Sequence, residues 1–207
     1  KAAGIEDLSD AELADLLQAI TEETTNGPSD QSGDNAVAAI AKLGPHIKQD
    51  KQGNVVELNL SSSKLTDAGL VHLKGQTKLQ TLSLNFTKIT DTGLVHLKGM
   101  TKLESLGLIN TQITDAGLVH LEGLTNLQSV TISTSPQITD VGLVHLKGLT
   151  NLEKLDLAGT KITDAGLVHL KGLTNLQELD LAGTDIVVFK GQLRLKQTKV
   201  TDAGLVH

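Results

Sequence analysis

The sequence predicts an α/β fold: a right-handed, curved solenoid with a parallel sheet on its concave side and short helices on its convex side. The first observation is a recurring string, T-D-x-G-L-V-H-L, whose last copy is shortened. Its copies begin at Thr66, Thr90, Thr114, Thr139, Thr163 and Thr201. The second is their spacing of 24, 24, 25, 24 and 38 residues, which is typical of stacked repeats. The third is a leucine-rich hexad between successive copies.

The hexad, L-x-x-L-x-L, predicts one short strand per repeat. Its last three residues alternate apolar, polar, apolar, which is the pattern of a strand with one buried face. The hexad residues are Leu79, Leu82 and Leu84; Leu103, Leu106 and Leu108; Leu127, Val130 and Ile132; Leu152, Leu155 and Leu157; Leu176, Leu179 and Leu181. The five hexads therefore predict five strands in a row.

The T-D-x-G-L segment predicts a helix of barely two turns. Thr66 or Asp67 can cap its N-terminus, and Asp is favourable at the positive end of the helix dipole. Leu70 and Leu73 lie on one helical face, and Gly75 is placed to end the helix. So short a helix depends on packing against its neighbours for stability.

A single repeat cannot bury enough apolar surface to fold alone, so the repeats must stack. Strands pack ~4.8 Å apart and helices ~10 Å apart, so the sheet side becomes concave. The predicted repeat domain is 54–207. Its units are 55–78, 79–102, 103–126, 127–151, 152–175 and 176–184, the last continuing into a shortened unit 185–198 and a partial unit 199–207.

The pattern L-x-x-L-x-L-x-x-T-x-I-T-D-x-G-L resembles the leucine-rich repeat, in the helix-containing, cysteine-free form abundant in bacterial, planctomycete-like proteins. The resemblance covers about residues 54–207 and implies a non-enzymatic scaffold that binds a protein partner. One departure is systematic: hydroxyl residues stand where the family has Asn after the strand. They are Ser63, Thr87, Thr111, Ser135, Thr160, Thr184 and Thr198. A hydroxyl can still satisfy backbone groups of the loop.

Residues 1–53 lie outside the repeats and predict a helical N-terminal cap. Ser9 and Glu12 form a capping box, and Leu8 and Leu13 form a hydrophobic staple, so an amphipathic helix is expected over 8–20. The alternative is that this helix binds a partner instead of covering the first repeat.

Three further segments complete the cap. A polar linker is expected over 21–34, a second helix over 35–43, and a hairpin over 46–60. The chain begins with Lys1 rather than Met, which indicates that the natural N-terminus is absent and leaves secretion and residence in the cytoplasm both open.

The C-terminal end breaks the period. The shortened unit 185–198 has a strand-like Leu193–Leu195 but no helical half, and the sequence stops at His207 in mid-helix. An uncapped apolar edge favours truncation of the array, and offers a surface for self-association.

Composition excludes several classes of function. The 207 residues carry a net charge of −6 with no basic run, which disfavours nucleic acid as a partner. No apolar stretch approaches the ~20 residues needed for membrane insertion. With no Cys, the chain has no disulfide, thiolate metal site or cysteine nucleophile.

The His and Asp residues that recur once per repeat are predicted to be structural. The His residues are 72, 96, 120, 145, 169 and 207, and the Asp residues are 67, 91, 115, 140, 164 and 202. Equivalent helical positions lie ~10 Å apart, too far to share a metal ion whose ligands sit ~2 Å from it. No unique catalytic trio stands out and no phosphate-binding loop is present, so we expect no enzyme, cofactor or metal.

The residues that vary between repeats on the concave face are the candidate partner site. They are Thr81, Ser83, Asn85, Ser105, Ser129, Thr131, Lys154, Asp156, Glu178, Asp180 and Arg194. The first half of this surface is small and neutral, and the second half is charged. Three alternatives stay open: a recognition module of a larger enzyme or receptor, carbohydrate or cell-wall binding, and an inner sheet that is only solvated and binds nothing. The second is disfavoured because no aromatic residue occupies these concave positions.

Overall fold

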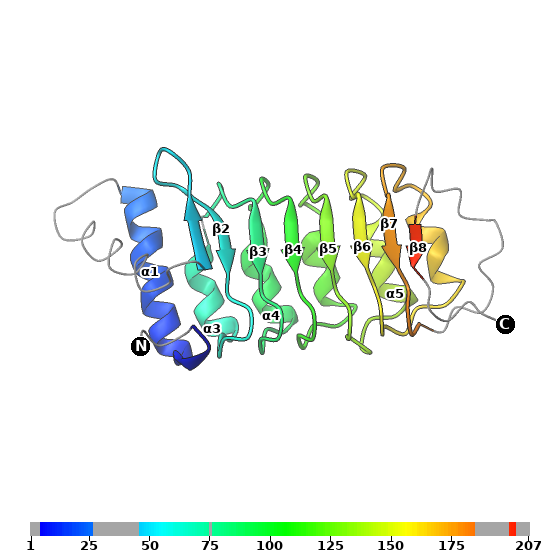
Figure 1. Cartoon of the computed structure of the whole chain (residues 1–207), viewed down its shortest axis with the longest axis horizontal. Helices are drawn as coiled ribbons and strands as arrows, with labels where there is room; N and C mark the ends of the chain where they lie inside the picture. The colour runs from blue at the N-terminus through cyan, green and yellow to red at the C-terminus, as the bar shows by residue number, and fades with distance from the viewer. Residues whose placement is uncertain (1–4, 27–45, 75, 185–198, 202–207) are drawn as a thin grey trace.

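A computed structural model describes residues 5–26, 46–74, 76–184 and 199–201. Its eight strands form one sheet in chain order, β1 to β8, with the short helices behind it (Figure 1). Strands β2 to β8 are parallel, and β1 is antiparallel to β2. The predicted solenoid of parallel strands and short helices is confirmed.

The five hexads each contribute one strand, β3 to β7, and the hairpin segment before them contributes β2; the central residue of each of the six is buried. The strands are β2 (Val55–Asn59), β3 (Thr81–Ser83), β4 (Ser105–Gly107), β5 (Ser129–Thr131), β6 (Lys154–Asp156) and β7 (Glu178–Asp180). Their buried central residues are in register: Leu58, Leu82, Leu106, Val130, Leu155 and Leu179. The flanking residues face away from the helices, on the surface that we call the concave face.

The helical halves are short, as predicted. They are α3 (Asp67–Leu70) with η3 (Val71–Leu73), α4 (Asp91–Leu94) with η4 (Val95–Leu97), η5 (Gly117–Leu121), α5 (Asp140–Leu143) with η6 (Val144–Leu146), and η7 (Gly166–Leu170). Thr66 and Thr90 are N-caps, and the Thr90 side chain accepts a hydrogen bond from the Thr92 amide. In three of the five helical halves, one turn of α-helix is followed by one turn of 3₁₀ helix. Such a tight last turn ends the helix within the few residues that are left before the next hexad begins.

Buried hydroxyls replace the family's asparagine by bonding within their own loop. Thr87 Oγ1 donates to the Leu84 carbonyl at 2.6 Å, and Thr160 Oγ1 donates to the Leu157 carbonyl at 2.6 Å. Both threonines are buried, so the bond satisfies two groups that have lost contact with water.

The N-terminal segment adds η1 (Ile5–Asp7) and α1 (Asp10–Asn26), and α1 packs against α3 at one end of the solenoid (Figure 1). The expected loop from Thr21 is wrong in part, because the helix continues to Asn26. No Gly or Pro occurs between Ser9 and Gly27, so nothing in the sequence breaks the helix earlier. The expected helix over 35–43 lies outside the described residues.

The predicted hairpin is confirmed. Strand β1 (Ile47–Gln49) pairs with β2 through a turn in which Gly53 has a φ of 83°. The Asp50 carboxylate accepts bonds from the amides of Gln52 and Asn54 and from the Asn54 side chain. The side-chain bond from Asn54 is the main reason that the pKa of Asp50 is lowered.

The last strand differs from the prediction. β8 (Lys199–Thr201) pairs with β7, whereas the repeat pattern places these residues in the coil before a helix. Strand β7 would otherwise present unpaired backbone groups, and the middle residue of Lys-Val-Thr is a β-branched residue that suits a strand. The strand-like Leu193–Leu195 and the rest of unit 185–198 lie outside the described residues.

Consecutive repeats are joined by hydrogen bonds that we call the Asp–Thr ladder. In each rung an Asp of one repeat accepts two bonds from the Thr of the next, one from the amide and one from Oγ1. Thr139 donates to Asp115 in this way at 2.8 and 2.6 Å. The rungs are Asp10–Thr66, Asp67–Thr90, Asp91–Thr114, Asp115–Thr139 and Asp140–Thr163. The recurring Asp is therefore structural, and it acts mainly between repeats.

Helix α1 takes part in the ladder as if it were a repeat. Asp10 supplies the first rung, and Ser9 stands where a repeat has Thr. Glu12 stands where a repeat has Gly, and its Oε2 accepts bonds from the Ser9 amide at 2.8 Å and the Ser9 hydroxyl at 2.7 Å. Glu12 thus makes the two bonds that an Asp of a preceding repeat would make, and the predicted capping box is confirmed.

One residue per repeat adopts the left-handed conformation just after the strand. These residues are Ser62, Phe86, Asn110, Thr134, Gly159 and Gly183, with φ values of 60°, 58°, 51°, 58°, 67° and 69°. The last two repeats use glycine, for which this conformation carries no steric cost. The turn geometry is shared, so the residue type at this position can vary without changing the fold.

We expect Thr134→Gly to stabilise the protein by about 0.5–1 kcal/mol. A left-handed L-residue costs ~1–2 kcal/mol, and the larger unfolded-state entropy of glycine offsets ~0.5–1 of it. Thr134 is exposed, so the change removes no buried contact. Urea unfolding measures the difference, with Thr125→Gly as the control at an exposed position outside the left-handed set. An equal effect of the two changes would contradict the explanation.

Candidate partner-binding site

The concave face carries ten of the eleven predicted site residues. Nine belong to strands β3 to β7, and Asn85 follows β3 by two residues. Arg194 lies outside the described residues. In the neutral half the members are partly buried, and Ser83 and Asn85 bond to each other, whereas Lys154 and Glu178 in the charged half are exposed.

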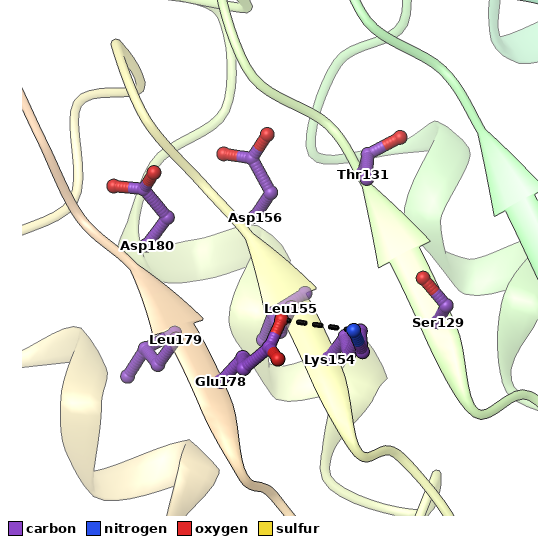
Figure 2. A pocket seen from close by; sticks show the side chains of 8 residues that line it. All are labelled: Ser129, Thr131, Lys154, Leu155, Asp156, Glu178, Leu179 and Asp180. Carbon is purple, nitrogen blue, oxygen red and sulfur yellow. Dashed lines mark ion pairs between the residues drawn. The ribbon is translucent and has the colours of Figure 1, made fainter. Parts of the chain in front are cut away.

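A shallow hollow of about 390 Å³ lies over strands β5, β6 and β7. It is lined by Ser129, Thr131, Lys154, Leu155, Asp156, Glu178, Leu179 and Asp180 (Figure 2). Six of these eight are predicted site residues, and the two leucines form the floor between them. The six come together because equivalent residues of successive repeats are register partners on adjacent parallel strands.

Asp156 and Asp180, which we call the acidic pair, stand side by side at the ends of β6 and β7. They are register partners, which places their Cα atoms ~4.8 Å apart. Figure 2 shows both carboxylates projecting from the sheet in the same direction. One oxygen of each is fixed by the amide two residues on, Ala158 or Ala182, at 3.0 Å. The other oxygen of each carboxylate makes no hydrogen bond within the described residues, so the pair offers two acceptors to solvent.

Lys154 does not neutralise the acidic pair. Its Nζ lies 3.1 Å from Glu178 Oε2, two register positions from the acidic pair along the same two strands (Figure 2). Both side chains of this ion pair are 56% exposed, so its contribution to stability is small. Among the described residues, neither Asp156 nor Asp180 has a cationic partner, and the two like charges remain adjacent.

A hydrogen-bonded network joins the ends of β2 and β3 in the neutral half of the face to the loop after β4. Asn85 Oδ1 accepts from the Ile109 amide at 2.8 Å, and its Nδ2 donates to Ser83 Oγ at 3.0 Å. Ser83 Oγ in turn lies 2.6 Å from Ser61 Oγ. A Cβ at Gly107 would lie 2.7 Å from Asn85 Oδ1, so glycine makes room for the asparagine. This network orders the surface next to the hollow.

The histidines lie apart from this face and have local roles. His145 Nδ1 lies 2.7 Å from Glu122 Oε1 of the preceding repeat, where other repeats have Lys. Burial, with a smaller effect from the Lys98 charge, lowers the pKa of His120. Within the ranges that the structure describes, no three His, Asp or Glu side chains gather closely enough to hold a metal ion.

Two large apolar residues beside this face, one exposed and one partly buried, were not predicted as site residues. Phe86 is 54% exposed, and Ile109 is partly buried. The Phe86 amide donates to the Ile109 carbonyl at 2.8 Å, which places the two next to each other. Comparing the same position in successive repeats would have revealed both, because the sister positions carry small or polar residues.

The chain matches two family models, each described as a leucine rich repeat. One matches residues 125–186, and the other matches residues 54–73 and 75–97. A search of curated protein sequences found no match. None of the helices in the described part of the chain combines the length and the apolarity needed to cross a membrane.

Solved structures share the fold at low sequence identity. Internalin C2 from Listeria monocytogenes is 24% identical with a TM-score of 0.57, over 94% of this chain and 96% of that one. Pollen receptor kinase 3 is 21% identical with a TM-score of 0.51, over 69% of this chain and 68% of that one. A chain of the TLR13-ssRNA13 complex is 24% identical with a TM-score of 0.50, over 64% of this chain and 19% of that one. These likenesses describe the fold alone.

Proposed function

Because this chain belongs to the leucine-rich repeat family, whose members are typically non-enzymatic interaction modules, we propose that it is a scaffold that binds a protein partner on its concave face. The observation that carries the proposal is the acidic pair. Asp156 and Asp180 are adjacent like charges, and Lys154, on the same two strands, is engaged with Glu178. Like charges opposite each other on a sheet destabilise it by a few tenths of a kcal/mol up to ~1.

Folding alone gives no reason to keep this repulsion. The register positions of Asp156 in β4 and β5 are Gly107 and Thr131, which are compatible with the same strand geometry. A cationic side chain of a partner would relieve the repulsion and gain charge-assisted hydrogen bonds with the two outward oxygens. The partner that this site suits is therefore a polypeptide that presents Lys or Arg to strands β6 and β7.

We expect Asp156→Ser with Asp180→Ser to weaken partner binding at least tenfold, to slow association and to flatten its salt dependence. Serine keeps an oxygen that can accept from the Ala158 and Ala182 amides, so we expect the free energy of unfolding to change by less than about 1 kcal/mol. The probes are peptides selected from a displayed library of random 12-residue sequences on the immobilised wild-type chain, then synthesised and titrated by fluorescence anisotropy.

The matched control is Glu6→Ser with Asp15→Ser, which removes the same charge from exposed positions at the α1 end of the solenoid. We expect it to leave affinity within twofold. Equal affinity of the acidic-pair variant and the wild type for every selected peptide would contradict the proposed site.

A further inference from the structure

Two departures from the repeat pattern, in different repeats, meet beside the concave face. Phe86 occupies the left-handed position that other described repeats fill with Ser, Asn, Thr or Gly. Ile109 occupies the position that they fill with Ser, Asn or Ala. Each is the one large apolar residue in its series among the described repeats, and the hydrogen bond from the Phe86 amide to the Ile109 carbonyl holds their backbones side by side.

Folding does not account for Phe86. Its φ of 58° is unfavourable for a bulky L-residue, and its side chain is 54% exposed, so little burial offsets the strain. Gly159 and Gly183 make the same turn without that strain. The turn imposes this conformation in every described repeat, so what folding leaves unexplained is the choice of a bulky apolar residue there, and such outliers are concentrated at sites that bind or react.

We infer that Phe86 and Ile109 form an apolar anchor for the same partner segment that the acidic pair binds. This inference rests on the proposed function and specifies its partner: an extended peptide with one basic side chain and one aliphatic or aromatic side chain. Aromatic residues are enriched among those that contribute most to binding at protein interfaces. The small, ordered surface of Ser105 and Gly107 between the two ends lets a backbone lie close to the sheet.

The distance between the apolar anchor and the acidic pair sets the length of the peptide segment that can contact both. Phe86 follows β3, and the acidic pair ends β6 and β7, so all three lie toward the carboxyl ends of their strands (Figure 1). Three to four strand spacings amount to about 14–19 Å, which about four to six extended residues span. We expect the basic and the apolar side chain of the peptide to be separated by that number of residues.

The same selection of random 12-residue peptides tests the anchor. We expect the enriched sequences to combine Lys or Arg with Phe, Leu, Ile, Met or Trp about four to six residues away. For the synthesised peptides, Phe86→Gly and Ile109→Ser should each weaken binding at least fivefold. Phe86→Gly should at the same time raise the midpoint of thermal unfolding, because it relieves strain.

Ser62→Gly is the matched control, since it relieves the same conformation in an exposed residue of the same series that follows β2, outside the path of the peptide. It should raise the unfolding midpoint and leave affinity within twofold. Peptides that lose affinity with the acidic-pair variant but not with Phe86→Gly would overturn the anchor and leave the proposed function standing. Peptides that are insensitive to both changes, or a library from which nothing is enriched, would contradict both.

Discussion

Replacing Gly142 with alanine will destabilise the protein by about 2–4 kcal/mol, although alanine normally stabilises a helix relative to glycine by ~0.5–1 kcal/mol. A Cβ at this position would collide with Asp115 Oδ1 of the preceding repeat and lie 2.9 Å from Leu118 Cδ1. Overpacking costs ~1–3 kcal/mol. Displacement of Asp115 also weakens its charge-assisted bonds to Thr139, and hydrogen bonds of this kind contribute ~1.5–3 kcal/mol.

A double-mutant cycle assigns this effect to the ladder. Asp115→Ala alone is expected to destabilise, because it leaves the Thr139 amide and hydroxyl without their acceptor. In that background Gly142→Ala should cost much less, about 1 kcal/mol or below, since the colliding carboxylate is gone and only the Leu118 methyl group has to shift. Gly123→Ala is the control: nothing lies within 4 Å of its Cβ position, so we expect a change below about 0.5 kcal/mol. Additive effects of Asp115→Ala and Gly142→Ala in urea unfolding would refute the explanation.

The second large effect is expected in the buried row of the sheet. Leu106→Ala should destabilise by about 2–5 kcal/mol, because Leu106 is 1% exposed and the solenoid on both sides limits collapse of the cavity. Leu106→Val should cost only about 0.5–1.5 kcal/mol, since its register partner in β5 is Val130. Val119→Ala, at a convex position 38% exposed, is the control and should change stability by less than about 0.5 kcal/mol. A loss below 1 kcal/mol for Leu106→Ala would contradict tight packing of this row.

The strands and their register could be predicted from the sequence because both follow from local alternation and a constant period. The hexad Leu103-Leu106-Leu108 alone indicates which side chains are buried, and the period indicates that Leu82 and Leu106 are partners. The position of Asp156 beside Asp180 followed from the same two facts.

The Asp–Thr ladder could not be predicted from one repeat, because its rungs join residues 23 or 24 apart, and 56 apart in the first rung, while a short-range cap explains the same letters. The repeat character of α1 was present in the sequence: Leu-Ser-Asp-Ala from Leu8 parallels Leu-Thr-Asp-Ala from Leu65. Glu12 in place of glycine concealed it. Strand β8 was missed because pairing with an open sheet edge competes with local pattern, and only the tertiary structure shows which prevails.

The same pair of Asp–Thr hydrogen bonds connects each described repeat up to Thr163 to the one before it. This has a consequence for how the number of repeats changes during evolution. Excision of residues 115–139 would join Thr114 directly to Asp140. Thr114 would still donate to Asp91, and Asp140 would still accept from Thr163. Recombination between repeated stretches of the gene can therefore shorten or lengthen the array without a new junction to optimise, and each event removes or adds one row of variable positions on the recognition surface.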